Sequence, residues 1–313
     1  MRVAVLDDYQ CVAASCADWS RLGCEVSYFD KPLGNDSEVA AALADFDVLV
    51  AMRERTPFGR DLLASLPRLR LLVTTGMRNA SIDVGAASDL GIVVCGTRSP
   101  GHATAELAFA LIQMLARGLR NEIESVEAGA WQVSLGRDLR GSTLGVIGLG
   151  RLGSQVAAFG QAFGMEVIAW SENLTDERAE EVGVRRVSKQ DLLESSDFVT
   201  VHLKLSDRTR GLIGASELAS MKPDAYIVNT SRAPIVEEGA LIAAVGSGSI
   251  AGAAVDVFGE EPLAPNHALR RDPAILTTPH IGYVTRETYE VFYSDALDDI
   301  EAWTADAPIR VLS

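Results

Sequence analysis

Short runs of apolar, often β-branched residues alternate with longer stretches of helical spacing along this chain of 313 residues. That alternation is typical of βαβ units around a parallel sheet. In the first third, helical spacing covers 37–44 and 60–66, and Ser37 or Asp36 is expected to cap the first of these helices. The strands predicted there are 3–6, 26–29, 48–51, 71–74 and 92–94.

A second α/β series follows a long predicted helix at 106–118 and a polar connection through Trp131 and Arg140. The last predicted element, 286–303, has the spacing of one amphipathic helix. Two series in tandem imply two doubly wound domains. The strands predicted in the second series are 143–147, 166–170, 198–202, 225–229, 252–257 and 275–278.

A glycine motif opens the second series. Gly148, Gly150 and Gly153 form Gly-x-Gly-x-x-Gly directly after strand 143–147 and at the start of a helical run. In such a motif the first glycine makes a tight turn, the second lets the backbone approach a pyrophosphate, and the third lets the helix pack close to the strand. The exposed N–H groups at the helix start then receive the phosphates. The motif therefore predicts a bound dinucleotide.

The residue expected at the adenosine ribose is not acidic. NAD-binding domains place a carboxylate about 20 positions after the motif, where it binds the 2′-hydroxyl. Here that place holds Ser171, with Glu172 beside it. A hydroxyl accommodates a 2′-phosphate better than a carboxylate does, yet Glu172 would repel that phosphate and no arginine is adjacent in sequence. The sequence leaves NAD and NADP open.

The charge balance excludes some classes of partner. Lys and Arg number 28 against 43 Asp and Glu, a formal net charge of −15, and such a chain repels the phosphate backbone of nucleic acids. Asp7 and Asp8 precede any apolar signal core, and the most apolar stretch, 105–115, is far shorter than the roughly 20 residues of a membrane span. A cytoplasmic protein is expected. Four cysteines without a CxxC pair and four histidines predict no metal site.

Three polar segments follow predicted strands of the second series. They contain Arg232, Glu261 and His280, each near the carboxyl end of a strand, where α/β proteins place their sites. Arg binds a carboxylate through two parallel hydrogen bonds, and His exchanges a proton near neutral pH. Glu beside an imidazole fixes its tautomer and favours its charged form. The set predicts acid–base chemistry on an acid substrate; the structural alternatives are an Arg–Glu surface pair and a histidine that fills a turn.

The order of these motifs resembles the D-isomer-specific 2-hydroxyacid dehydrogenases, a family that includes phosphoglycerate, glyoxylate and formate dehydrogenases. The resemblance covers nearly the whole chain and does not name a substrate. The segments that carry it are 75–83 (TGMRNASID), the Gly148 motif, 229–232 (NTSR), Glu261-Pro262 and Pro279-His280.

The family resemblance implies a fold and a reaction. It implies a Rossmann domain that binds NAD or NADP at 99–282, and a flavodoxin-like substrate domain at 1–98 and 283–313 on which the helix 286–303 returns to pack. The reaction transfers a hydride between the nicotinamide and C2 of a D-2-hydroxy acid or 2-oxo acid, with a histidine as acid or base. The implied partners are this small acid and a second copy of the chain in a homodimer.

The resemblance also implies roles for particular residues. Arg232, Glu261 and His280 match the family's catalytic residues, and Gly76, Met77 and Arg78 match a loop whose N–H groups bind the substrate carboxylate. Asp256 matches the residue that accepts from the nicotinamide carboxamide. The other positions that match the cofactor site are Gly148, Gly150, Arg151, Leu152, Gly153, Ser171, Thr209 and Thr230.

At one position the chain departs from the family. Lys204 stands where the family commonly has proline, in a loop that borders the adenosine end of the cofactor. We hypothesise that Lys204 and Ser171 pair with a 2′-phosphate. The alternative is a lysine that faces solvent.

Two other interpretations share this architecture. One is a transcriptional corepressor that binds NAD(H), and the other is a dehydrogenase that takes its hydride from formate or phosphite. Turnover of any 2-oxo acid would exclude the purely binding role of a corepressor.

Arg53, Arg78 and His102 are candidates for binding a second anionic group of the substrate, each with a surface charge as the alternative.

Overall fold

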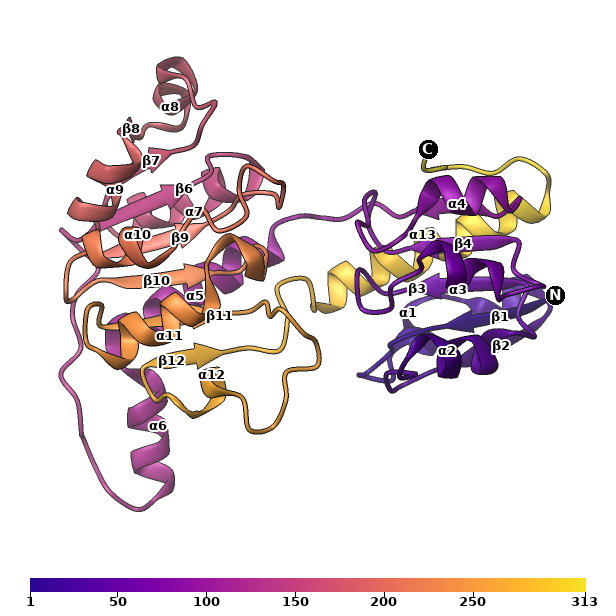
Figure 1. Cartoon of the computed structure of the whole chain (residues 1–313), viewed down its shortest axis with the longest axis horizontal. Helices are drawn as coiled ribbons and strands as arrows, with labels where there is room; N and C mark the ends of the chain where they lie inside the picture. Colours follow the sequence, from indigo (N-terminus) through magenta and orange to yellow (C-terminus); the bar gives the residue numbers. More distant parts are fainter. The chain divides into compact units, whose positions relative to one another are not determined.

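The structure is a computed structural model that describes all 313 residues. By its internal contacts the chain divides into unit 1, Met1–Pro100 with Val284–Ser313, and unit 2, Gly101–Tyr283 (Figure 1). Unit 1 is therefore built from both ends of the chain. None of the helices combines the length and apolar character that crossing a membrane requires.

Unit 1 contains a five-stranded parallel sheet in the order β2-β1-β3-β4-β5. This is a flavodoxin-like strand order. All five predicted strands are present, with ends that differ from the prediction by up to two residues. Their bounds are Arg2–Val5 for β1, Glu25–Tyr28 for β2, Val48–Ala51 for β3, Leu71–Thr74 for β4 and Val93–Gly96 for β5.

The last helix of the chain, α13 (Arg286–Thr304), completes the core of unit 1 (Figure 1). It packs against α1, β4 and β5, as the return helix implied by the family does. Its buried side chains include Tyr289, Phe292, Tyr293, Leu297 and Ile300. The other helices of unit 1 are α1 (Ala13–Cys16), the 3₁₀ helix η1 (Trp19–Leu22), α2 (Asp36–Leu43), α3 (Arg60–Ala64) and α4 (Val84–Asp89).

The cap of α2 corrects the sequence prediction. Asn35, rather than Ser37 or Asp36, is the N-cap, and its Oδ1 accepts from Ser37 N (3.0 Å) and Glu38 N (3.2 Å). The Glu38 carboxylate accepts in return from Asn35 N (2.8 Å). This reciprocal capping box satisfies free N–H groups of the first turn and so fixes the start of the helix at Asp36.

A buried charged cluster ties α13 to the rest of unit 1. Asp295 Oδ1 accepts from Arg98 Nη2 (2.7 Å), and Asp299 Oδ1 accepts from Arg310 Nε (3.0 Å). Both carboxylates are fully buried, and Asp299 Oδ2 has no hydrogen-bond partner. Burial raises the pKa of Asp299 to about 7, against the opposing effect of Arg310. Asp299 thus favours its protonated form well above the pH at which an exposed carboxyl ionises.

Unit 2 contains a seven-stranded parallel sheet in the order β12-β11-β10-β9-β6-β7-β8. Read from β8 to β11 this is the Rossmann order, with β12 added at one edge. The six predicted strands are present, and β8, a two-residue exposed edge strand, was missed because it has no apolar run. The bounds are Thr143–Ile147 (β6), Glu166–Trp170 (β7), Arg185–Arg186 (β8), Phe198–Val201 (β9), Tyr226–Asn229 (β10), Gly252–Val255 (β11) and Ile275–Thr277 (β12).

The connection expected after residue 118 contains a helix, α6 (Leu119–Glu127). Ile123 and Val126 lie on it at helical spacing, yet both are more than half exposed, so burial did not mark the helix. The other helices of unit 2 are α5 (Ala103–Arg117), α7 (Arg151–Ala162), α8 (Asp176–Val182), α9 (Lys189–Ser195), α10 (Ala215–Ser220), η2 (Ala233–Ile235), α11 (Glu238–Gly246) and α12 (Ala268–Arg271).

Candidate active site

The glycine motif forms an open cradle between β6 and α7. Gly148 has φ +99°, and a Cβ there would lie 2.8 Å from His202 O, so only glycine fits this turn. A Cβ on Gly153 would overlap Gly148 O, whereas one on Gly150 would have no neighbour within 4 Å. Helix α7 begins at Arg151 without a side-chain cap. Uncapped N–H groups beside an open glycine backbone fit the pyrophosphate of a dinucleotide.

The proposed ribose and adenosine residues lie at the ends of neighbouring strands. Ser171 follows β7 and begins a turn in which its carbonyl accepts from Leu174 N (3.0 Å). Thr209 Oγ1 donates to Lys204 O (2.7 Å) and accepts from Ser206 N (2.8 Å), so its hydroxyl organises this loop. The Lys204 side chain is exposed. The direct cofactor contacts expected of these residues stay predictions.

His202, which the sequence analysis did not select, lies directly under the Gly148 turn. Its Nε2 is 2.9 Å from Thr200 Oγ1, on a fully buried threonine of β9. Burial lowers the pKa of His202 to about 4, so the imidazole is neutral at physiological pH. The signal in the sequence was a polar residue that ends an apolar strand.

The turn after β10 presents Arg232. Asn229 is buried, and its side chain accepts from Ser231 N (3.0 Å) and donates to Arg232 O (3.1 Å). These two hydrogen bonds close a compact turn that ends at Arg232. The guanidinium of Arg232 donates from Nη1 to Ser231 O (2.8 Å). Beside it, the buried Thr230 Oγ1 has no hydrogen-bond partner in the chain, which suits a residue that borders a bound cofactor.

Asp256 follows β11 and organises the turn that carries His280. Its Oδ1 accepts from Thr278 Oγ1 (2.6 Å) and Ile281 N (2.8 Å), and its Oδ2 accepts from Gly282 N (2.8 Å). Burial raises the pKa of Asp256, while these hydrogen bonds act in the opposite direction. Three of about four acceptor positions of the carboxylate are therefore used within the chain. A contact to the nicotinamide carboxamide, expected from the family, has only the remaining position.

His280 and Glu261 are brought into direct contact. His280 Nδ1 is 2.8 Å from Glu261 Oε2, and Glu261 Oε1 accepts from Phe258 N (3.0 Å). The His280 ring also packs edge-on against Tyr283, with 5.4 Å between centroids. His280 has φ +53°, a conformation uncommon for a residue other than glycine. With Nδ1 held by a carboxylate, Nε2 is the ring nitrogen on the side of the imidazole away from Glu261.

The predicted substrate loop lies in unit 1. Gly76 has φ +90°, and its N–H donates to Thr97 Oγ1 (2.7 Å). Arg53 Nη1 donates to Thr75 O (2.9 Å), and a Cβ on Gly76 would overlap that guanidinium. Met77 and Arg78 are exposed. The structure thus joins Arg53 to the Gly76–Arg78 loop, as the candidate for a second anionic group.

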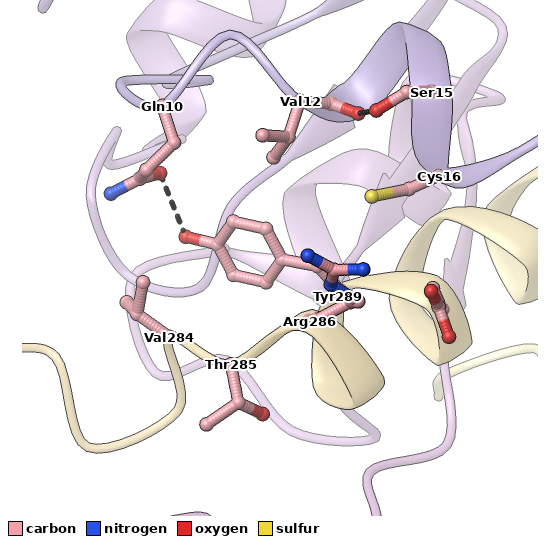
Figure 2. Close-up of a pocket in the computed structure, with 9 residues that line it drawn as sticks. Gln10, Val12, Ser15, Cys16, Val284, Thr285, Arg286 and Tyr289 are labelled. Atoms are coloured by element: carbon pink, nitrogen blue, oxygen red, sulfur yellow. Dashed lines mark hydrogen bonds between the residues drawn. The ribbon is translucent and has the colours of Figure 1, made fainter.

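A separate pocket in unit 1 contains none of the predicted site residues. It lies between α1 and the start of α13, and Figure 2 shows the Tyr289 hydroxyl directed at Gln10, with 3.1 Å between Oη and Oε1. Cys16 also lines this pocket, and burial raises the pKa of its thiol, so it is not activated as a thiolate.

The Rossmann sheet, the glycine cradle and the His280–Glu261 pair define an α/β oxidoreductase domain that binds a dinucleotide. Comparison with known proteins agrees: the family model described as "D-isomer specific 2-hydroxyacid dehydrogenase, NAD binding domain" matches residues 109–282. The chain belongs to the D-isomer specific 2-hydroxyacid dehydrogenase family and is an NAD-dependent oxidoreductase.

Individual relatives extend the match beyond the cofactor domain. A glyoxylate reductase from Aeropyrum pernix is 45% identical over 240 residues, which are 73% of this chain and 71% of the relative. A D-3-phosphoglycerate dehydrogenase from Archaeoglobus fulgidus is 37% identical over 266 residues, 83% of this chain but 50% of the relative. The chain thus spans about half the length of that phosphoglycerate dehydrogenase.

Among solved structures, a phosphoglycerate oxidoreductase from Vibrio cholerae matches with a TM-score of 0.94 and 37% identity over 98% of this chain and 100% of that one. These relatives are reductases and dehydrogenases. They support the dehydrogenase interpretation rather than the corepressor or the formate and phosphite alternatives.

Proposed function

We propose that the chain reduces a small 2-oxo acid to the D-2-hydroxy acid, with His280 as the proton donor. The observation that carries the proposal is the His280–Glu261 pair, in which a carboxylate oxygen lies 2.8 Å from Nδ1 and directs the reactive Nε2 outward. The turn that presents His280 is held by the Asp256 carboxylate, which accepts hydrogen bonds from Ile281 N and Gly282 N. The same residues catalyse the reverse oxidation, with His280 as the base.

In this mechanism each residue has a defined task. Arg232 binds the substrate carboxylate and polarises the ketone oxygen through its guanidinium. When bound, the reduced nicotinamide supplies the hydride that C2 receives. The ketone oxygen takes a proton from Nε2 of His280, and Glu261 stabilises the imidazolium before that transfer. The oxo acid thus gains one hydride and one proton and becomes the hydroxy acid.

Unit 1 is proposed to bind the substrate carboxylate together with Arg232. The N–H groups of the Gly76–Arg78 loop that bind this carboxylate are those of Met77 and Arg78, because Gly76 N already donates to Thr97 Oγ1. Arg53 lies against that loop. Glyoxylate, the substrate named for the Aeropyrum relative, has no group beyond the oxo acid. A substrate with a further anionic group would use Arg53 or Arg78.

The reaction is tested by following the absorbance of NADH and NADPH with glyoxylate, hydroxypyruvate and phenylpyruvate. We expect turnover of at least one of these acids by the wild type and its loss in His280→Ala. The matched control is His267→Ala, a histidine near Glu238 in the same unit that has no part in the proposed site. Absence of turnover with all three acids and both cofactors would count against the proposal.

The Lys204 hypothesis has its own test. If Lys204 pairs with a 2′-phosphate, Lys204→Ala raises the KM for NADPH and leaves the KM for NADH unchanged. An unchanged KM for NADPH would show that the exposed Lys204 faces solvent also when the cofactor binds.

We also propose a homodimer in the cytoplasm. Unit 2 exposes large apolar side chains on α6 and the segment after it, among them Trp131 (74% exposed) and Leu135 (99% exposed). Clustered exposed apolar residues mark surfaces that bind another protein. In sedimentation experiments the wild type should be a dimer and Leu135→Asp a monomer or a weaker dimer. A monomeric wild type would refute the homodimer.

A further inference from the structure

An arginine that the sequence analysis did not select reaches the cofactor cradle. Arg178 lies in the first turn of α8, whose N-cap is Thr175. Its Nη2 is 3.2 Å from Ser154 Oγ, and Ser154 belongs to the first turn of α7, the helix that begins at the glycine cradle. The guanidinium therefore lies beside the end of α7 to which the phosphates of a dinucleotide bind.

The guanidinium of Arg178 is accessible to an anion, because its ion pair within the chain is weak and exposed. Its Nη1 is 2.9 Å from Glu181 Oε2, an exposed pair three residues apart on one helix, which contributes little to stability. The side chain of Arg178 is 46% exposed, so solvent or a ligand can reach the guanidinium. Glu172, exposed in the turn after β7, is the carboxylate that would oppose a phosphate there.

Strand order places Arg178 on the same side of the cradle as Ser171. Ser171 directly follows β7, and α8 is the next element in the chain. Lys204 comes after β9, which lies on the opposite side of β6. Neighbouring strands are about 4.8 Å apart, so the ends of β7 and β9 are separated by roughly 10 Å. Lys204 would have to span this separation to meet a phosphate at Ser171, whereas Arg178 lies on the helix that follows β7.

We propose that Arg178, positioned by Ser154 and with Ser171 at the end of β7, is the binding site for a 2′-phosphate on the adenosine ribose of the cofactor. This inference rests on the proposed function, because it requires that a dinucleotide binds with its pyrophosphate at α7. The guanidinium presents paired N–H donors that match two phosphate oxygens, while the Ser171 hydroxyl neither repels nor excludes the phosphate. The ligand class is an adenosine 2′-phosphate, as in NADP.

The test measures binding rather than turnover. ADP-ribose and 2′-phospho-ADP-ribose are titrated into the wild-type chain in a calorimeter, since neither carries a nicotinamide. We expect the wild type to bind the 2′-phosphorylated ligand at least as tightly as ADP-ribose. Arg178→Ala should weaken binding of 2′-phospho-ADP-ribose about tenfold or more and change ADP-ribose binding less than threefold, because one charge-assisted contact is lost.

Arg186→Ala is the matched control. Arg186 is an arginine of equal exposure (45%) that pairs with Asp176 at the start of the same helix, and no contact links it to α7. It should leave both affinities unchanged. Ser154→Ala should give a smaller loss for the 2′-phosphorylated ligand alone, and Arg178→Lys should recover part of the affinity.

The outcomes distinguish failure of the 2′-phosphate site from failure of the proposed function. If the wild type binds ADP-ribose but binds its 2′-phosphorylated form tenfold more weakly, or if Arg178→Ala weakens both ligands equally, the 2′-phosphate site is refuted while dinucleotide binding stands. If the wild type binds neither ligand and turns over no oxo acid, the proposed function itself fails. Equal losses in Arg178→Ala and Arg186→Ala would also overturn the site, since they would reflect general electrostatics.

Discussion

The substitution Asp256→Asn tests whether one buried carboxylate holds the His280 turn in place. Asparagine has nearly the same shape, but only one of its two terminal atoms accepts hydrogen bonds. With Oδ1 turned toward Thr278 and Ile281, the amide NH₂ would face Gly282 N, a donor against a donor. A buried N–H on Gly282 is then left without an acceptor.

The expected loss follows from these contacts. One hydrogen bond to a charged acceptor disappears and one buried donor is unsatisfied, which together cost about 2–3 kcal/mol of unfolding free energy. For a domain of 150–250 residues this lowers Tm by roughly 4–12 °C. Because the displaced turn carries His280, a misplacement of about 1 Å lowers kcat by on the order of 10²-fold.

The assay combines thermal unfolding with steady-state kinetics. Asp256→Asn should lower Tm and kcat together and leave the KM for NADH within a few-fold of the wild type. Thr278→Val, which removes one donor and leaves the carboxylate in place, should cost about 1 kcal/mol. If Asp256→Asn raises the KM for NADH with unchanged Tm and kcat, the carboxylate binds the cofactor. The hypothesis that it holds the His280 turn in place is then refuted.

Three further predictions concern other parts of the chain. His280→Ala should lower kcat by roughly 10²–10⁴ with cofactor affinity unchanged, and equal losses in both would indicate misfolding. Arg232→Ala should mainly raise the KM for the oxo acid; an unchanged KM would contradict its role. Asp299 has its pKa raised from 3.8 to about 7, so its contribution to stability is present below about pH 4 and lost as the pH rises through 7. Denaturation from pH 4 to 8 should show the wild type losing up to about 1.4 kcal/mol per pH unit relative to Asp299→Asn, and parallel curves would exclude this.

The sheets could be predicted because parallel strands are buried on both faces and so appear as apolar runs. All eleven strands expected from such runs are present, and the exception, β8, has two exposed arginines in place of an apolar run. Helix α6 was missed for a related reason, since its apolar residues are exposed and stand among charged ones in the sequence. The pattern reports burial, and elements that bury little do not produce it.

The site was predicted as a set of residue types, but its supporting contacts were not. Asp256 binds groups 22 to 26 positions later in the chain, and Arg178 reaches Ser154 across 24 positions. Spacing along a sequence does not reveal such contacts, because the fold determines which loops meet. Asn35 was missed for a local reason: the helix begins one residue earlier than its apolar pattern.

The discontinuity of unit 1 sets the order in which the chain can fold during synthesis. The first 100 residues form all five strands of the unit 1 sheet, but the buried side chains of α13, such as Phe292 and Tyr293, lie at the far end of the chain. Domains commonly fold in the order in which they leave the ribosome. Here unit 2 emerges whole and can close its core first, while one face of the earlier sheet stays uncovered until α13 arrives. The nascent chain thus exposes the apolar face of the unit 1 sheet during the interval in which unit 2 is made, and that face can aggregate in this interval.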